Sequence, residues 1–216
     1  MKNKLSLFLL IFGLGLQAQA QLSLGIKGGY TRAWEDYGDV ALPPNAPIEI
    51  NGANVTLMSW YRFNRRLSVG IEPGYVRRGA ACIPGFVIWN GDTRFLLDYV
   101  EMPVMIRFDI LSLAKQRFQL YSKLGAGASM IVRAQQEVVR FDDPEATTRT
   151  PIDLGENSIL NRWDTGGYAA VGTSLKLGQN QLLLEGNFYY GLIDASRSFQ
   201  SQNRSFNVNL GFMHNF

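Results

Sequence analysis

Hydrophobic and polar residues alternate with a period of two along most of the chain after residue 20. Between Leu67 and Tyr75 the odd-numbered positions are apolar, while the even-numbered positions hold serine, glycine and glutamate. The segment 206–216 repeats the pattern, with asparagine and glycine on its polar side. This periodicity indicates β-strands with one apolar and one polar face. The sequence therefore predicts an all-β protein.

Eight segments follow this alternation, and the connections between them are alternately short and long. The predicted strands are residues 22–32, 53–63, 67–78, 96–108, 117–133, 163–177, 181–193 and 204–216. The short connections are 64–66, 109–116 and 178–180, and the long ones are 33–52, 79–95, 134–162 and 194–203. A strand of about 11 residues tilted by about 40° rises roughly 28 Å, close to the ~25 Å apolar band of outer-membrane barrels. We therefore predict an eight-stranded antiparallel up-and-down transmembrane β-barrel, with its short turns and both termini in the periplasm.

Formal charges gather on one face of these segments, and we assign that face to the barrel interior. The inward charged residues are Lys27, Arg62, Glu72, Arg78, Glu101, Arg107, Lys123, Lys176 and Glu185. Arg77 and Asp98 are outward exceptions near strand ends. Outward aromatic residues form an external group (Tyr30, Tyr75, Phe188, Tyr190, Phe206) and a periplasmic group (Tyr61, Phe63, Phe108, Phe118, Phe212, Phe216). Because a charge at the lipid-facing midplane costs ~2–4 kcal/mol and aromatic girdles mark membrane interfaces, we expect the outer surface to contact lipid.

Residues 1–20 have the features of a secretory signal peptide. Lys2 and Lys4 precede an apolar stretch, and Ala18-Gln19-Ala20 matches a cleavage site. We therefore predict a signal peptide over 1–20 and an outer-membrane barrel domain over 21–216. Removing the two leader lysines lowers the formal net charge from +3 to +1, so the charge balance gives no support for nucleic-acid binding.

Four strand segments carry a resemblance to a known family. They are Leu67–Tyr75, Tyr99–Arg107, Asp164–Leu175 and Leu184–Leu192. In this order along the chain they resemble the PorT-like outer-membrane β-barrel family. The resemblance implies an eight-stranded barrel in the outer membrane of a Gram-negative bacterium. It implies little about activity, because nothing in the chain matches a functional residue of the branch that is tied to protein secretion.

The sequence offers little material for a catalytic or metal site. His214 is the only histidine and Cys82 the only cysteine, which excludes multi-histidine and thiolate metal clusters. We expect His214 on the outward face at the periplasmic interface, beside Phe212 and Phe216. We therefore predict no catalytic, cofactor-binding or metal-binding residues, no cofactor and no enzymatic activity. A lipid-modifying enzyme is the alternative, since some small outer-membrane barrels act on lipids with a histidine–serine set near the external rim.

The inward charges admit a functional and a structural interpretation. Glu72, Glu101 and Glu185 share the predicted lumen with several lysines and arginines. They could form a proton or ion path or a paired-carboxylate acid–base site. The interpretation we favour is mutual neutralisation, because an eight-stranded barrel has room only for side chains. A soluble lipocalin-like binding barrel is a further alternative, but its interior should be apolar.

Long loops are the expected places for a partner, because binding residues are concentrated on loops. The loops concerned are 33–51, 79–94 and 134–161. The first and third each carry a formal charge of −4, which indicates a solvated acidic rim or, less simply, a site for a cation or a basic partner. The second contains an apolar cluster over 82–89 that either binds a partner or packs on the other loops. We therefore expect a non-enzymatic protein of the cell outer membrane, surrounded by outer-membrane lipid, with a binding or envelope-assembly role through these loops and without nucleic acid.

Overall fold

Ten β-strands occur in the residues that the computed structural model describes, which are 22–38, 49–81, 91–113, 117–140, 147–155, 158–198 and 200–216. They are β1 (Leu22–Asp36), β2 (Glu49–Arg62), β3 (Leu67–Ile71), β4 (Gly74–Ala81), β5 (Gly91–Leu113), β6 (Phe118–Arg140), β7 (Thr148–Pro151), β8 (Trp163–Leu177), β9 (Asn180–Asp194) and β10 (Gln202–Asn215). No helix in this part of the chain is long and apolar enough to cross a membrane. The predicted signal peptide, 1–20, lies outside the described residues.

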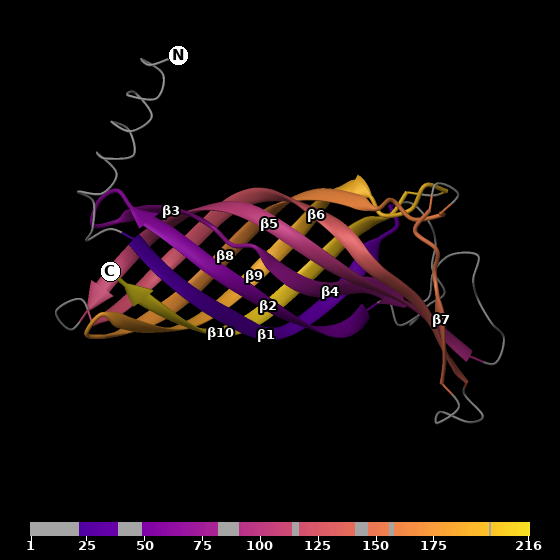
Figure 1. The fold of residues 1–216 in the computed structure, drawn as a ribbon, viewed down its shortest axis with the longest axis horizontal. Coiled ribbons are helices and arrows are strands. Elements are labelled where there is room, and N and C mark those ends of the chain that lie inside the picture. Colours follow the sequence, from indigo (N-terminus) through magenta and orange to yellow (C-terminus); the bar gives the residue numbers. More distant parts are fainter. Residues whose placement is uncertain are drawn as a thin grey trace, which may run out of the picture.

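The strands wind as an antiparallel sheet around one axis and close into a barrel (Figure 1). β3 and β4 share one position in the ring, because both pair with β2 on one side and with β5 on the other. They are separated at Glu72 and Pro73, and proline cannot donate to a strand ladder. The Pro73 carbonyl still accepts a hydrogen bond from the Leu57 N–H, at 2.9 Å. The ring therefore contains eight strands, as predicted.

The first and last strands close the barrel. β1 and β10 pair antiparallel from Ser23 opposite Asn215 to Asp36 opposite Gln202. The predicted strands 22–32 and 204–216 are therefore the pair that closes the barrel. Closure matters because an open strand edge in hydrocarbon would leave backbone N–H and C=O groups without partners.

β5 and β6 are much longer than the predicted strands 96–108 and 117–133. Their pairing continues until Gly91 lies opposite Arg140. β7 adds a further strand to β6 within the predicted loop 134–162, which is therefore partly sheet. Figure 1 shows β7 and the outer ends of β5 and β6 projecting from the end of the barrel opposite to the C-terminus. Outside the membrane no lipid requires one apolar face, so hydrogen bonding continues after the alternation has ended.

A β-bulge separates the barrel part of this hairpin from its extension. Tyr99 pairs with Ile131 and Asp98 pairs with Arg133, so Val132 is an extra residue on β6. One extra residue exchanges the two faces of a strand. The alternation of polar and apolar residues therefore could not predict the part of β6 beyond Val132.

The predicted inward and outward faces agree with the structure. Val104 on the lipid face is 53% exposed, whereas the inward Lys27 and Glu185 are 4% and 2% exposed. The two outward exceptions also have a physical explanation. Arg77 and Asp98 lie opposite each other on β4 and β5 and form an ion pair, with 2.7 Å between Nε and Oδ1.

Aromatic side chains surround both ends of the apolar band. The exposed members are Tyr30, Phe188, Tyr190 and Phe206 at the external end, and Tyr61, Phe63, Phe108, Phe118, Phe212 and Phe216 at the periplasmic end. Tyr75, predicted with the external group, is partly buried. The two girdles bound the membrane-spanning part of the barrel, since aromatic residues gather at membrane interfaces.

Val104→Arg should lower the free energy of unfolding by ~2–4 kcal/mol, because it places a charge on the lipid face near the middle of the band. Val132→Arg is the matched control, since Val132 is also exposed but lies at the external end, where the cost is about 0–1 kcal/mol. Urea unfolding of both variants in lipid vesicles gives the two values. Equal, small effects would contradict the assigned depth of Val104.

Candidate functional site

Four charged side chains form a closed ring of ion pairs inside the barrel. Lys27 Nζ lies 2.6 Å from Glu72 and 2.5 Å from Glu185, and Lys123 Nζ lies 2.6 Å from each of the same two carboxylates. Lys27 belongs to β1, Lys123 to β6 and Glu185 to β9, while Glu72 occupies the break between β3 and β4. None of the four is more than 4% exposed. The charges cancel, and the ring connects strands from all around the barrel.

Two aromatic residues complete the surroundings of this ring. The Tyr121 hydroxyl donates a hydrogen bond to Glu185 Oε2 at 3.1 Å. Lys123 Nζ lies 4.8 Å from the centroid of a Trp60 ring, within the range of a cation–π contact. Buried ion pairs persist only where their geometry is good and their remaining polar atoms are bonded. The ring has these properties, so its charges are stabilised inside the barrel.

Three more of the inward charges, Arg78, Glu101 and Arg107, also form ion pairs. Arg78 binds Glu101, which in addition accepts a hydrogen bond from the Tyr168 hydroxyl at 3.0 Å. Arg107 Nε lies 2.8 Å from Asp109 Oδ1. These contacts show that most of the predicted inward charges neutralise one another.

Little space remains in the middle of the barrel. One cavity beside Lys27 and Glu72 and another beside Arg107 each have a volume of about 10 Å³. Such a volume holds about one water molecule. Arg62 and Lys176, the other predicted inward cations, have no ion-pair partner among the described residues. The packed middle leaves the two ends of the barrel as the places for binding chemistry.

His214 lies where it was predicted, at the periplasmic end of β10. Its Nδ1 is 2.8 Å from Asn180 Oδ1, and its ring packs edge-on against Phe216 with 4.8 Å between centroids. Neither neighbour is a nucleophile or an acid. In the part of the chain that the structure describes, no three histidine, cysteine, aspartate or glutamate side chains gather in a metal-binding arrangement. The apolar cluster over 82–89, which includes Cys82, lies outside the described residues.

Three acidic residues of the long connections form ion pairs in the described part of the chain, while the acidic rim as a whole stays a prediction. Ion pairs join Glu49 to Arg32, Asp36 to Arg204 and Glu137 to Arg149. Arg32 and Arg204 precede or follow the loops in sequence, so a count of charges within each loop could not find them. Asp39, Asp142, Asp143, Glu145 and Glu156 lie outside the described residues.

Glu35 is buried at the external end of the lumen, beyond the membrane-spanning part of β1. Only 4% of it is exposed, and the equally buried Asp164 of β8 is a nearby negative charge. Burial raises the pKa of Glu35 to about 7; Asp164 acts in the same direction, and hydrogen bonds from Ser201 and Tyr37 oppose it. Glu35 falls within the predicted loop 33–51, whereas in the structure it belongs to β1. Its position could have indicated this burial, because Glu35 lies an even number of residues after the inward Lys27 on the same strand, and such residues share a face.

The closed ring of strands, the lipid-facing apolar band and the paired lumen together define an outer-membrane β-barrel protein. The chain belongs to the family of outer membrane protein beta-barrel domains, whose model matches residues 17–197. Its location is therefore the cell outer membrane. The family and the fold do not distinguish the PorT-like branch from others.

Solved structures of similar fold come from several bacteria. Neisserial surface protein A (NspA) is 12% identical with a TM-score of 0.51, and the match covers 90% of this chain and 97% of that one. Pseudomonas aeruginosa OprG is 13% identical with a TM-score of 0.47, covering 93% of this chain and 99% of that one. Yersinia pestis Ail, the attachment invasion locus protein, is 18% identical with a TM-score of 0.44, covering 89% and 99%. At these identities the likeness concerns the fold alone, and no curated protein sequence gives a significant match.

Lys123→Met should destabilise the barrel by ~3–5 kcal/mol, because it leaves Glu72 and Glu185 with a single buried cation between them. Adding Glu185→Gln restores neutrality and should recover most of that loss. Urea unfolding of the two single variants and the double variant in lipid vesicles forms a double-mutant cycle. Additive effects would contradict the ring.

Glu35→Gln should change how stability depends on pH. Because the folded state holds the proton up to about pH 7 while the unfolded chain releases it near 4.5, the wild type loses stability as the pH rises through that window. The variant should therefore equal the wild type at pH 4 and exceed it at pH 8. Unfolding titrations at both values measure this, with the exposed Asp153→Asn as control. An unchanged difference between the two pH values would contradict the raised pKa.

Proposed function

We propose that this chain is a non-enzymatic outer-membrane protein that binds a protein or ligand at the cell surface. The binding element is the external sheet, which we define as β7 with residues 91–98 of β5 and 133–140 of β6. One observation carries the proposal: β5 and β6 stay paired beyond the membrane band, as far as Gly91 and Arg140. An extension built on a continuous strand ladder holds its surface in a fixed orientation, which lowers the entropic cost of binding.

The contacts of the external sheet support a positioned binding surface. Thr148, Arg149, Thr150 and Pro151, which make up β7, are all exposed. Arg149 Nε lies 2.7 Å from Glu137 Oε1, yet the arginine side chain remains 61% exposed. Among the described strands β7 ends the strand order of the sheet, and an edge strand of this kind can pair with an extended segment of a partner.

The interior supports a function at the surface rather than through the barrel. The ion-pair ring of Lys27, Glu72, Lys123 and Glu185 fills the middle of the lumen, and His214 lies beside an amide and an aromatic ring at the periplasmic end. A role in envelope assembly is the variant of this proposal in which the partner is another envelope protein.

We also assign residues 1–20 to a signal peptide and, on the motif Tyr99–Arg107, the chain to the PorT-like branch.

A photoreactive residue at Thr150 tests this proposal directly. In intact cells it should crosslink a partner that the same residue placed at lipid-facing Leu192 does not. Arg149→Ala, which removes an exposed external ion pair, should reduce the crosslinked product several-fold. Arg32→Ala is the matched control, because it removes the exposed Arg32–Glu49 pair from β1 and β2. Folding of each variant is checked by heat-modifiable gel mobility.

Two outcomes would contradict the proposal. One is an equal loss of crosslinking in both alanine variants, which would remove the special role of β7. The other is a changed acylation pattern in lipids extracted from cells with and without the protein, which would support the lipid-modifying enzyme instead.

A further inference from the structure

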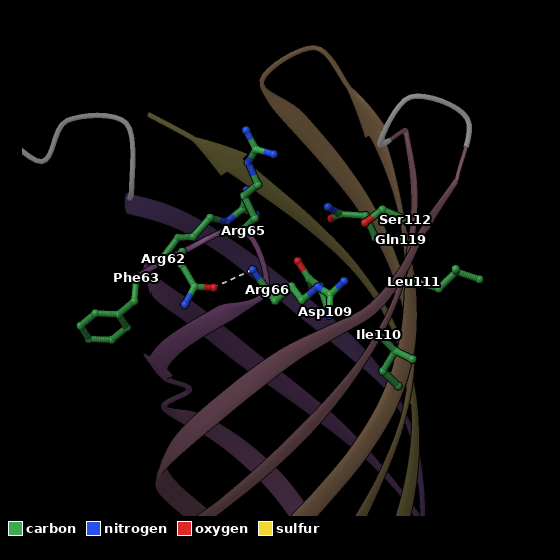
Figure 2. Close-up of a pocket in the computed structure, with 10 residues that line it drawn as sticks. Arg62, Phe63, Arg65, Arg66, Asp109, Ile110, Leu111, Ser112 and Gln119 are labelled. Carbon is green, nitrogen blue, oxygen red and sulfur yellow. Dashed lines mark hydrogen bonds between the residues drawn. The ribbon is translucent and has the colours of Figure 1, made fainter.

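The connection between β2 and β3 places three arginines beside a cavity at the periplasmic mouth of the barrel (Figure 2). Arg62 ends β2, and Arg65 and Arg66 belong to the turn that follows. The cavity has a volume of about 480 Å³, which is in the range of small-molecule sites. Its other walls come from the periplasmic ends of β5 and β6.

The turn is held in place by hydrogen bonds. Asn64 Oδ1 accepts hydrogen bonds from the backbone N–H groups of Arg66 and Leu67, at 2.8 and 2.9 Å. The Asp109 N–H donates to the Arg66 carbonyl at 2.8 Å, which ties the turn to β5. The arginine backbones are therefore positioned before any ligand arrives.

The charge of this site is not compensated by the described residues. Asp109 is the acid on its wall, and both Asp109 and its ion-pair partner Arg107 are almost fully buried. Across the described ranges, no carboxylate lies within ion-pair distance of Arg62, Arg65 or Arg66. Guanidinium groups bind phosphate with two parallel hydrogen bonds, so three of them at one cavity suit a phosphate group.

Three apolar side chains, which we call the apolar wall, lie on the lipid-facing surface to either side of the cavity. Phe63, Ile110 and Leu111 are 58%, 49% and 46% exposed, and Figure 2 shows their side chains pointing away from the barrel. A register shift between Asp109 and Leu111 makes Ile110 an extra residue, which lets two successive apolar side chains face outward. A free phosphate ion would use only the arginines. A lipid would use both walls.

From this arrangement we infer that the periplasmic mouth binds an anionic glycerophospholipid of the inner leaflet. The phosphate lies among Arg62, Arg65 and Arg66, and the acyl chains run along Phe63 and Leu111. Basic residues at a membrane surface attract anionic headgroups, and a pocket that adds apolar contacts selects a lipid over the free ion. This inference is independent of the external sheet, which lies at the other end of the barrel.

Native mass spectrometry of the full mature protein in an uncharged detergent tests the inference. The probe is an equal mixture of phosphatidylglycerol and phosphatidylcholine, and the readout is the ratio of the two lipid adducts. The wild type should favour phosphatidylglycerol, and Arg65→Gln/Arg66→Gln should lower that preference by about tenfold or more. Arg133→Gln/Arg162→Gln, which removes two exposed arginines at the external end, should leave it unchanged.

Two further arms distinguish the lipid from free phosphate. Phe63→Ser/Leu111→Ser should also reduce the phosphatidylglycerol adducts, because it removes the apolar wall and keeps the arginines. Inorganic phosphate in millimolar excess should displace few of them; full displacement would overturn the lipid in favour of the free ion. An unchanged preference in Arg65→Gln/Arg66→Gln, or an equal loss in the external control, would overturn the site itself. Heat-modifiable gel mobility verifies folding, and Arg65→Gln alone replaces the double variant if the latter does not fold.

Discussion

The requirement that every backbone N–H and C=O in the hydrocarbon be hydrogen-bonded governs this structure. Only closure of β1 against β10 satisfies it for a sheet, and closure with eight strands leaves a lumen just wide enough for side chains. The inward positions must then hold groups that neutralise one another at short range. The ring of two lysines and two glutamates follows from that narrowness, and so does the displacement of binding chemistry to the barrel ends.

Much of the barrel could be predicted from the sequence, because the membrane imposes a simple rule on it. Lipid excludes charge from one face, and the period of a strand is two, so the strands, their faces and their closure were readable from residues such as Val104 and Glu185. The same rule ends at the membrane surface. The extension of β5 and β6, the strand β7 and the bulge at Val132 depend on pairing between segments, which leaves no periodic mark in a single sequence.

The candidate sites were less predictable for a related reason. A count of charges within a loop cannot show that Asp36 meets Arg204, since 168 residues separate them along the chain. Glu35 was misplaced because its strand continues past the apolar alternation. Arg65 and Arg66 were not recognised as part of a site, since a short turn with basic residues looks like an ordinary solvated connection. Only the folded arrangement shows that β5 brings an apolar wall and no free acid to the same place.

The ion-pair ring also bears on how the barrel selects one strand alignment over others. A slip of one residue between strands exchanges their faces and is rejected by lipid, but a slip of two residues restores the faces and leaves alternation intact. Such a slip moves a side chain by roughly 6.6 Å along its neighbour. Contacts of 2.5 to 2.6 Å between Lys27, Glu72, Lys123 and Glu185 do not survive that displacement. These four charges thus favour the native strand register, and with it the native shear of the barrel. The hydrophobic pattern alone fits registers shifted by two residues equally well.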